Sequence, residues 1–154
     1  MSSLPSTVIV GTDHAGFELK EALIPLLAQH GFTIHDLSPT LMPNDDYPQI
    51  SHEVAIRVTQ KPEQNWGVLF CGSGIGASMV ANRHAGIRAA LIRNEIDASM
   101  AREHNHANIL VLGGRITKAN ELSTILDAWI STAPSQEERH TRRIQAIDED
   151  IDKK

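Results

Sequence analysis

The segment Leu69-Phe70-Cys71-Gly72-Ser73-Gly74-Ile75-Gly76 lies near the middle of the chain and carries its strongest fold signal. The apolar run 68–70 predicts a buried strand, the glycines at alternate positions predict a tight loop, and 77–82 predicts a helix. A strand, a glycine loop and a helix in this order are typical of phosphate or anion binding. The glycines admit a ligand close to the backbone, and the first N–H groups of the helix point at it unpaired. A loop that only held phosphate would not need the thiol of Cys71, so we interpret this loop as a reaction centre.

The rest of the chain alternates predicted strands and helices around this segment. Besides 66–70, apolar runs predict strands at 8–11, 33–37, 87–92 and 109–112. Helices are predicted at 17–30, from Pro48 through Val58, and at 77–82, 97–103 and 121–129. Strands that alternate with helices predict a three-layer, Rossmann-like α/β fold with a doubly wound parallel sheet of about five strands.

Local signals refine the predicted helix at 17–30. Pro25 lies inside it, and proline there is expected to kink the helix or break its hydrogen bonding. Gly31 follows its end and is expected at the C′ position.

The C-terminal tail differs in character from the predicted core. We expect a single domain over 1–154, with an α/β core at 7–133 and a C-terminal helix and tail at 134–154. Residues 134–138 resemble a capping box that opens a last helix. Arg139 and Arg143 then share one face, and His140, Ile144, Ile147 and Ile151 form an apolar stripe. Such an appended helix often packs on a partner subunit.

Composition and charge exclude several classes of protein. The chain has 154 residues, of which 41% are hydrophobic and 21% charged, as in soluble globular proteins. A net charge of −5 argues against a nucleic-acid-binding surface. No apolar run approaches the roughly 20 residues of a membrane span, and residues 1–6 lack the features of a signal peptide. One cysteine cannot form an internal disulfide, so a reducing, cytoplasmic setting is expected.

Three polar residues follow predicted strands and are expected to meet. Asp13, Cys71 and Arg115 each come after a strand. The carboxyl ends of parallel strands lie at one edge of a sheet, where ligands bind. We therefore expect these three side chains to converge.

Each of these features also has a purely structural interpretation. The glycine loop matches neither a Walker loop nor a dinucleotide fingerprint and could be only a tight turn. Cys71 could be an inert buried thiol, although a helix start favours the thiolate and so a base or nucleophile. Asp13 and His14 could be only a helix N-cap and its neighbour. His104 and His106 could join Cys71 or Asp13 around a metal, but the spacing of zinc ligands is absent.

Several motifs, taken in order, resemble one family. The chain contains Gly11-Thr12-Asp13-His14-Ala15-Gly16-Phe17, Asp46-Tyr47-Pro48, the segment 71–76, Asn82-Arg83 with Gly86-Ile87-Arg88-Ala89, and His104-Asn105 with Ala107-Asn108. From about residue 8 to residue 147 it resembles ribose-5-phosphate isomerase type B, among the sugar-phosphate isomerases that also include galactose-6-phosphate isomerase.

The resemblance implies an aldose–ketose isomerase that interconverts ribose 5-phosphate and ribulose 5-phosphate without a metal or an organic cofactor. It implies that Cys71 is the base, that His104 opens the furanose ring with help from Asp13, and that the Ser73 hydroxyl and the loop hold the enediolate oxygens. The implied phosphate ligands are His14, Arg115, Arg139 and Arg143, and Asn105 is implied for the sugar hydroxyls. The whole implied substrate-binding set is Asp13, His14, Tyr47, Gly72, Ser73, Gly74, Ile75, Gly76, Asn105, Arg115, Arg139 and Arg143.

Family members are dimers or pairs of dimers with each site built across the interface, so the resemblance implies a homodimer. His104 and the basic residues near the tail would then face Cys71 of the other subunit. Two positions depart from the family pattern: Ser73 stands where some members have threonine, and His106 where aspartate is more usual.

Other functions stay open at this point. An isomerase of the same fold could act on allose or galactose 6-phosphate or on a tetrose phosphate. A phosphosugar-binding protein without turnover would have no use for a base. An enzyme with Cys71 as a covalent nucleophile would form a trappable intermediate.

Overall fold

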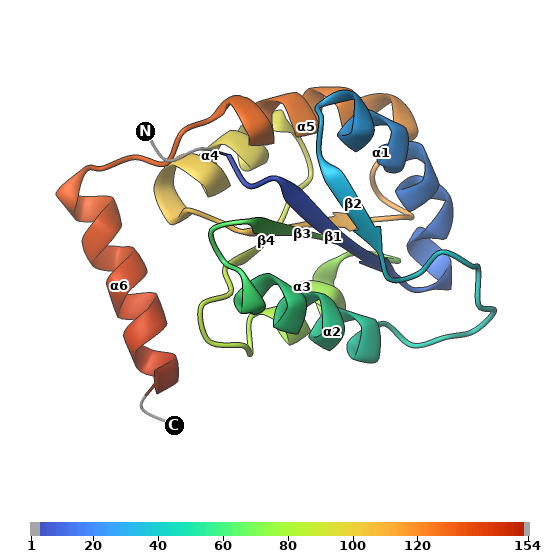
Figure 1. The fold of residues 1–154 in the computed structure, drawn as a ribbon, viewed down its shortest axis with the longest axis horizontal. Helices are drawn as coiled ribbons and strands as arrows, with labels where there is room; N and C mark the ends of the chain where they lie inside the picture. Colours follow the sequence, from blue (N-terminus) through green and yellow to red (C-terminus); the bar gives the residue numbers. More distant parts are fainter. Residues whose placement is uncertain (1–3, 153–154) are drawn as a thin grey trace.

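The computed structural model describes residues 4–152, which form a five-stranded sheet with helices on both faces (Figure 1). The strands are β1 (Thr7–Thr12), β2 (Thr33–Asp36), β3 (Asn65–Cys71), β4 (Ala89–Leu91) and β5 (Ile109–Gly113). Their order is β2-β1-β3-β5-β4, and every neighbouring pair is parallel. The predicted Rossmann-like fold with a parallel, doubly wound sheet is confirmed.

The helices cover the sheet in two layers, α2 (Tyr47–Gln60) and α3 (Ile75–Ala81) on one face and α1 (Phe17–Gln29), α4 (Glu95–Asn105) and α5 (Leu122–Ser131) on the other (Figure 1). Successive residues of a strand point to opposite faces of the sheet. Val68 and Phe70 join the cluster under α1, α4 and α5, whereas Leu69 and Cys71 join the cluster under α2 and α3. This period of two is the expected consequence of the pleat.

The central strand β3 is buried along its whole length. It ends at Cys71, and its end is tied to the segment after β5 by backbone hydrogen bonds. Gly114 N–H donates to the Cys71 carbonyl (2.8 Å), and Arg115 N–H donates to the Gly72 carbonyl (2.9 Å). The neighbouring loops therefore hold each other in place at the carboxyl edge of the sheet.

The fourth strand is shorter than predicted. It spans Ala89–Leu91 rather than 87–92, because Ile87 N–H donates to the His84 carbonyl in a turn and Arg88 N–H donates to the Asn108 side chain. At its other end, Ile92 N–H still donates to the Val111 carbonyl.

Helix ends agree with the predictions in part. Gly31 follows α1 with a positive φ of 84°, as expected at C′. Pro25 lies on the exposed side of α1, and the helix continues past it without interruption, because solvent can solvate the freed carbonyl. Pro48 is the second residue of α2 rather than the first, since the helix begins at Tyr47.

Helix α6 (Glu138–Asp152) stands apart from the body of the molecule (Figure 1). The capping box expected at 134–138 is wrong. The Ser135 hydroxyl accepts from Glu137 N–H instead, so the helix starts only at Glu138. Ile144 is buried against the chain, whereas Ile147 is 44% exposed. Residues 1–3 and 153–154 of the predicted domain, and the side chain of Ile151, lie outside what the structure describes.

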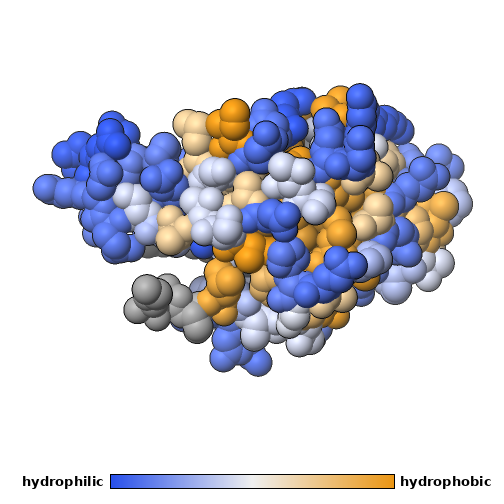
Figure 2. All heavy atoms as spheres, turned by 90° about the horizontal axis from the view of Figure 1, so that it is seen from above, coloured by the Kyte–Doolittle hydropathy of each residue, from blue (hydrophilic) through white to orange (hydrophobic). Residues whose placement is uncertain are grey.

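Figure 2 looks down on the face formed by α1, α4 and α5, and shows a predominantly hydrophilic projection at the side of the body where α6 lies. The only ion pair recorded between α6 and the body within residues 4–152 joins Arg88 Nη1 to Asp148 Oδ2 at 2.9 Å. No helix in that range is long and apolar enough to cross a membrane.

Arg102 fixes the C-terminal half of α4 from inside the core. Its guanidinium lies 4.6 Å from the Trp66 ring centroid and 5.5 Å from that of Trp129, and it donates to the Ala107 carbonyl. Burial lowers the pKa of Arg102 to about 10, which leaves it charged at neutral pH. Cation–π contacts to two rings therefore anchor the last turns of α4.

Candidate active site

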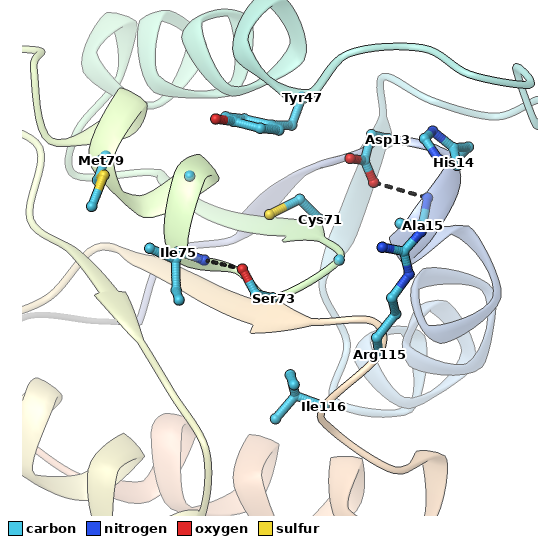
Figure 3. Close-up of a pocket in the computed structure, with 12 residues that line it drawn as sticks. Asp13, His14, Ala15, Tyr47, Cys71, Ser73, Ile75, Met79, Arg115 and Ile116 are labelled. Atoms are coloured by element: carbon cyan, nitrogen blue, oxygen red, sulfur yellow. Dashed lines mark hydrogen bonds between the residues drawn. The ribbon is translucent and has the colours of Figure 1, made fainter.

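A cavity of about 570 Å³ opens at the carboxyl edge of the sheet (Figure 3). The first turn after β1, the loop and helix after β3, and the segment after β5 all contribute to it, as expected for a parallel sheet. Tyr47, at the start of α2, closes one side. The lining residues are Asp13, His14, Ala15, Tyr47, Cys71, Gly72, Ser73, Ile75, Gly76, Met79, Arg115 and Ile116.

Asp13 caps the short helical turn His14–Gly16 and also faces the cavity. Its Oδ1 accepts from the N–H groups of Ala15 (3.0 Å) and Gly16 (3.3 Å). Figure 3 shows the other carboxyl oxygen directed toward the side of the cavity that Tyr47 closes. Asp13 is only 6% exposed, and its burial raises its pKa above the ordinary 3.8, against the lowering effect of the two N–H donors. The N-cap and the functional interpretations of Asp13 are therefore compatible.

His14 is held by the loop that precedes α2. Its N–H donates to Asp45 Oδ1 (2.7 Å), and its ring Nδ1 lies 3.1 Å from the Asp45 carbonyl oxygen. With Nδ1 engaged in this way, Nε2 is the ring nitrogen left to meet a ligand.

A buried lysine anchors the other end of the same loop. Lys20 is fully buried in α1, and its Nζ contacts Asp36 Oδ2 (2.6 Å) and the Ser38 carbonyl (2.9 Å). The Ser38 hydroxyl in turn accepts from Thr12 N–H (2.8 Å). A charge buried in α1 thus ties the end of β2 to the last residue of β1, next to Asp13.

The Cys71 thiol lies at the base of the glycine loop, 3% exposed but lining the cavity. Gly74 N–H donates to its Sγ (3.2 Å). Gly74 adopts a left-handed conformation (φ 78°), and a Cβ there would lie 2.5 Å from Leu91 Cδ1, so only glycine fits. Gly74 is not among the residues that line the cavity, because this turn packs it against Leu91 and Leu112 beneath the loop, and its predicted role in substrate binding stays a prediction.

The loop presents unpaired donors to the cavity. The Ser73 hydroxyl accepts from Ile75 N–H (3.2 Å), as Figure 3 shows. Within residues 4–152, no hydrogen bond is recorded for the N–H groups of Ser73 and Gly76, two residues that line the cavity. Such preorganised backbone donors can stabilise an oxyanion.

Gly76 is required by the ring of Tyr47. A Cβ on Gly76 would lie 2.3 Å from Tyr47 Cζ and 2.5 Å from its hydroxyl oxygen. The phenol therefore packs directly on the first turn of α3, which brings the start of α2 against the glycine loop.

Arg115 supplies a positive charge at the mouth of the cavity. Its Nη1 lies 3.2 Å from the position that a Cβ on Gly72 would occupy. No ion pair is recorded for it among the described residues. Figure 3 shows the guanidinium turned toward Ala15 and the Asp13 side of the cavity. An anionic group of a ligand could therefore bind there.

Four predicted site residues lie elsewhere in the same chain: His104, Asn105, Arg139 and Arg143. Helix α4 runs antiparallel to the strands, so its last turn, with His104 and Asn105, lies where β5 begins. The cavity lies where β5 ends, about 13 Å further at the 3.3 Å rise of a parallel strand. A site that uses the whole predicted set cannot be assembled within one chain of this structure.

These remote residues form a cluster of their own on α4 and α6. The rings of His104 and His140 stack face to face, with centroids 4.4 Å apart and planes 5° from parallel. Arg139 Nε binds Glu137 Oε2 (2.7 Å). Burial, and then the neighbouring His104, lower the pKa of His140.

The sequence did not identify three apolar residues that line the cavity, Ala15, Met79 and Ile116. Met79 lies four residues after Ile75 on the same helix face, and that spacing is a signal that would have found it. Ile116 follows Arg115 directly. Asp45, which holds His14, gave no signal, because the loop 38–46 has no periodicity.

Within residues 4–152, no group of three His, Cys, Asp or Glu side chains lies close enough together to hold a metal ion. His104 meets His140, and His106 meets the Ser135 carbonyl (2.8 Å). Neither approaches Cys71 or Asp13.

Comparison with known proteins finds one family throughout. A family described as Ribose/Galactose Isomerase matches residues 8–147. Ribose-5-phosphate isomerase B of Escherichia coli is 35% identical over 140 residues, covering 91% of this chain and 93% of that protein. The protein of the same name from Mycobacterium tuberculosis is 38% identical over 143 residues, covering 92% and 88%.

Solved structures agree with these sequence matches. Ribose-5-phosphate isomerase B of Mycoplasma genitalium, with bound ribulose-5-phosphate, superposes with a TM-score of 0.91 at 33% identity, covering 99% of this chain and 100% of the other. The type B enzyme of Trypanosoma cruzi gives a TM-score of 0.90 at 38% identity, covering 97% and 99%.

The raised pKa of Asp13 predicts how the stability of the Asp13→Asn variant depends on pH. The folded chain binds the Asp13 proton more tightly than the unfolded chain does, so ionisation of Asp13 destabilises the fold. An asparagine at this position would keep a capping oxygen without titrating. We expect the free energy of unfolding of the variant, minus that of the wild type, to rise as pH increases from below 3.8 through the raised pKa.

Urea unfolding across this pH range measures the difference. Asp46→Asn is the matched control, since Asp46 is exposed and its side chain makes no cap hydrogen bond. A difference for Asp13→Asn that stays flat, or falls with pH, would contradict the prediction.

Proposed function

The chain belongs to the Ribose/Galactose Isomerase family and is an isomerase, and we propose that it interconverts ribose 5-phosphate and ribulose 5-phosphate through an enediolate with Cys71 as the base. One observation carries the proposal. A thiol, a carboxyl group, a guanidinium and unpaired backbone donors line a single cavity at the carboxyl edge of the sheet. The ribulose-5-phosphate bound in the M. genitalium relative supports the choice of substrate.

Ring opening is the first step for the aldose. A base takes the proton of the C1 hydroxyl, the C1–O4 bond breaks with its electron pair going to O4, and an acid protonates O4. We assign the acid to His104 of a partner subunit and the base to Asp13. Its raised pKa makes Asp13 a stronger base than an ordinary carboxylate, as general-base catalysis favours.

Proton transfer between C2 and C1 follows on the open chain. The Cys71 thiolate removes the C2 proton, the electron pair forms the C1–C2 double bond, and the carbonyl oxygen becomes an oxyanion. The proton of the C2 hydroxyl passes to the C1 oxygen, and Cys71 then returns its proton to C1 as the C2 oxygen becomes the carbonyl of the ketose. The N–H groups of Ser73 and Gly76 are available to the developing charge, and one such donor is typically worth about 3–4 kcal/mol in the transition state.

The phosphate needs positive charge away from the reacting carbons. Arg115 supplies it from the cavity's own chain, where the His14 ring also lines the cavity as a proposed phosphate ligand. Arg139 and Arg143, on α6, would supply it from the partner, while Asn105 beside His104 would bind the sugar hydroxyls. Arginine suits this role because its planar fork matches phosphate oxygens.

A homodimer, or a pair of dimers, follows from this assignment. The two groups of site residues lie at opposite edges of one sheet, so a complete site needs the second group from another copy. The apolar side chains at the rim support this arrangement, since Met79 is 66% exposed and Ile116 51% exposed in the single chain. The cytoplasmic location expected from the single cysteine stays a prediction.

An assay of turnover tests the proposed substrate. We expect rapid interconversion of ribose 5-phosphate and ribulose 5-phosphate that a chelator does not slow, and much weaker turnover of allose 6-phosphate, galactose 6-phosphate and a tetrose phosphate. Preferred turnover of one of these others would keep the chemistry and change the substrate. Tight binding of all of them without turnover would favour a phosphosugar-binding protein.

Cys71→Ala tests the base directly. We expect kcat to fall by about 10³-fold or more, because the carbon-bound proton loses the base assigned to it, while phosphosugar binding measured by calorimetry changes little. Ser78→Ala, on the nearby helix α3 but outside the cavity lining, is the matched control. Substantial residual activity of Cys71→Ala would remove Cys71 from the role of base.

Mixing two variants that are each inactive toward ribose 5-phosphate, with that sugar as the assay substrate, tests the shared site. If His104 acts on the Cys71 cavity of a partner, a mixed dimer of Cys71→Ala and His104→Ala subunits contains one intact site. Random mixing should then recover roughly a quarter of the wild-type activity. Mixed subunits that exchange but stay inactive would contradict a site built across the interface.

A further inference from the structure

His140 is a buried titratable residue that the mechanism above does not use. It lies on the first turn of α6, is 5% exposed, and stacks on His104 with ring centroids 4.4 Å apart and planes 5° from parallel. Near-parallel overlap of this kind restricts rotation of both rings about the Cβ–Cγ bond.

Among the described residues, no hydrogen bond orients the His104 ring. Within residues 4–152, its one charged neighbour on α4 is Glu103, whose Oε2 lies 3.6 Å from His104 Nε2, beyond hydrogen-bond distance. The terminal torsion of histidine is broad when nothing restrains it. The stack on His140 is therefore the contact that sets the plane of this imidazole.

Separate contacts hold the two helices in register around the stack. Ser135 is bound on both sides by the end of α4, because its N–H donates to the Glu103 carbonyl (2.9 Å) and its carbonyl accepts from His106 Nε2 (2.8 Å). His106 adopts a left-handed conformation (φ 47°) that turns its ring toward this linker. Further along α6, Asp148 binds Arg88. The platform for His104 is thus built by its own chain.

Orientation matters because proton transfer is sensitive to geometry. A group that protonates O4 of the furanose must point a ring nitrogen at that oxygen within hydrogen-bond distance, and a misplacement of about 1 Å can cost on the order of 10²-fold in rate. Cys71, Asp13 and Ser73 are each held by backbone hydrogen bonds, whereas His104 depends on a neighbouring ring.

We propose that His140 is a positioning residue that fixes the His104 imidazole for furanose ring opening through the face-to-face stack between α4 and α6. The inference rests on the proposed function, in which His104 opens the ring. His140 touches neither Cys71 nor the cavity of its own chain.

The two directions of the reaction separate ring opening from the later chemistry. Ribose 5-phosphate enters as a furanose and has to be opened. Ribulose 5-phosphate is always open, because its C5 oxygen carries the phosphate and cannot close a ring. The aldehyde formed from ribulose 5-phosphate can leave the site open and close its ring in solution without the enzyme. A defect confined to His104 should therefore slow turnover of the cyclic aldose far more than turnover of the ketose.

Three variants test the stack, with kcat and KM measured in both directions. We expect His140→Ala to lower kcat for ribose 5-phosphate at least about tenfold, to change kcat for ribulose 5-phosphate less than about threefold, and to leave KM near wild type. His140→Phe keeps a flat ring in place and should recover most of the lost kcat. The double variant His104→Ala/His140→Ala should be no slower than His104→Ala alone. Gln145→Ala, an exposed change on α6, is the matched control.

The alternatives give different patterns. Equal losses in both directions, or a rise in KM alone, would mean that His140 only anchors α6 and its arginines, and would overturn the inference. Failure of His140→Phe to recover activity, or additive losses in the double variant, would also overturn it. Absence of turnover by the wild type in either direction would overturn the proposed function, and the inference with it.

Discussion

The structure depends on the buried strand β3 and on the two backbone hydrogen bonds that tie its end to the segment after β5. Gly114 N–H and Arg115 N–H donate to the carbonyls of Cys71 and Gly72. These bonds bring the thiol and the guanidinium to the same edge and leave the side chains of both segments free to face the cavity. The left-handed Gly74 then turns the chain into α3, and its N–H donates to the Cys71 thiol. Because β3 is buried along its length, the loop is supported by the most protected part of the sheet.

A second constraint divides the functional residues between two edges of the sheet. In a parallel α/β fold each helix returns the chain to the start of the next strand, so residues at strand ends and residues at helix ends lie on opposite edges. Asp13, Cys71 and Arg115 follow strands, whereas His104 and Asn105 end a helix. Neither group has the acid, the base and the phosphate ligands together. The separation makes a second copy of the chain part of the proposed chemistry.

The two groups are organised by different physics. In the cavity, backbone N–H groups donate to the side chains of Asp13, Cys71 and Ser73, and burial raises the pKa of Asp13. At the far edge, ring stacking and cation–π contacts dominate, with Arg102 held between Trp66 and Trp129 and His104 stacked on His140. The buried Lys20 and the partly buried His106 both bind loops, one before α2 and one before α6. The first loop holds His14 through Asp45, and the second precedes Arg139 and Arg143, so both loops support residues proposed to bind phosphate.

The sequence by itself determined the fold class and the edge of the sheet at which Cys71, Asp13 and Arg115 meet, because hydrophobic periodicity and strand ends are local properties. It also indicated the left-handed Gly31, since a glycine just past a helix is a local signal. The family motifs indicated Tyr47 as a site residue.

Only the tertiary structure decided that Gly74 lies beneath the loop and that Met79 and Ile116 line the cavity. Only the tertiary structure also decided how α2, α4 and α6 pack. The stack of His104 on His140 joins residues 36 positions apart, and no local pattern encodes a contact between two helix ends. The late start of α6 at Glu138 was likewise outside local reasoning, because long-range hydrogen bonds join the Ser135 backbone to the end of α4 while its hydroxyl accepts from Glu137 N–H. Local chemistry thus specified which groups the chain carries, and packing across the sheet decided which of them meet.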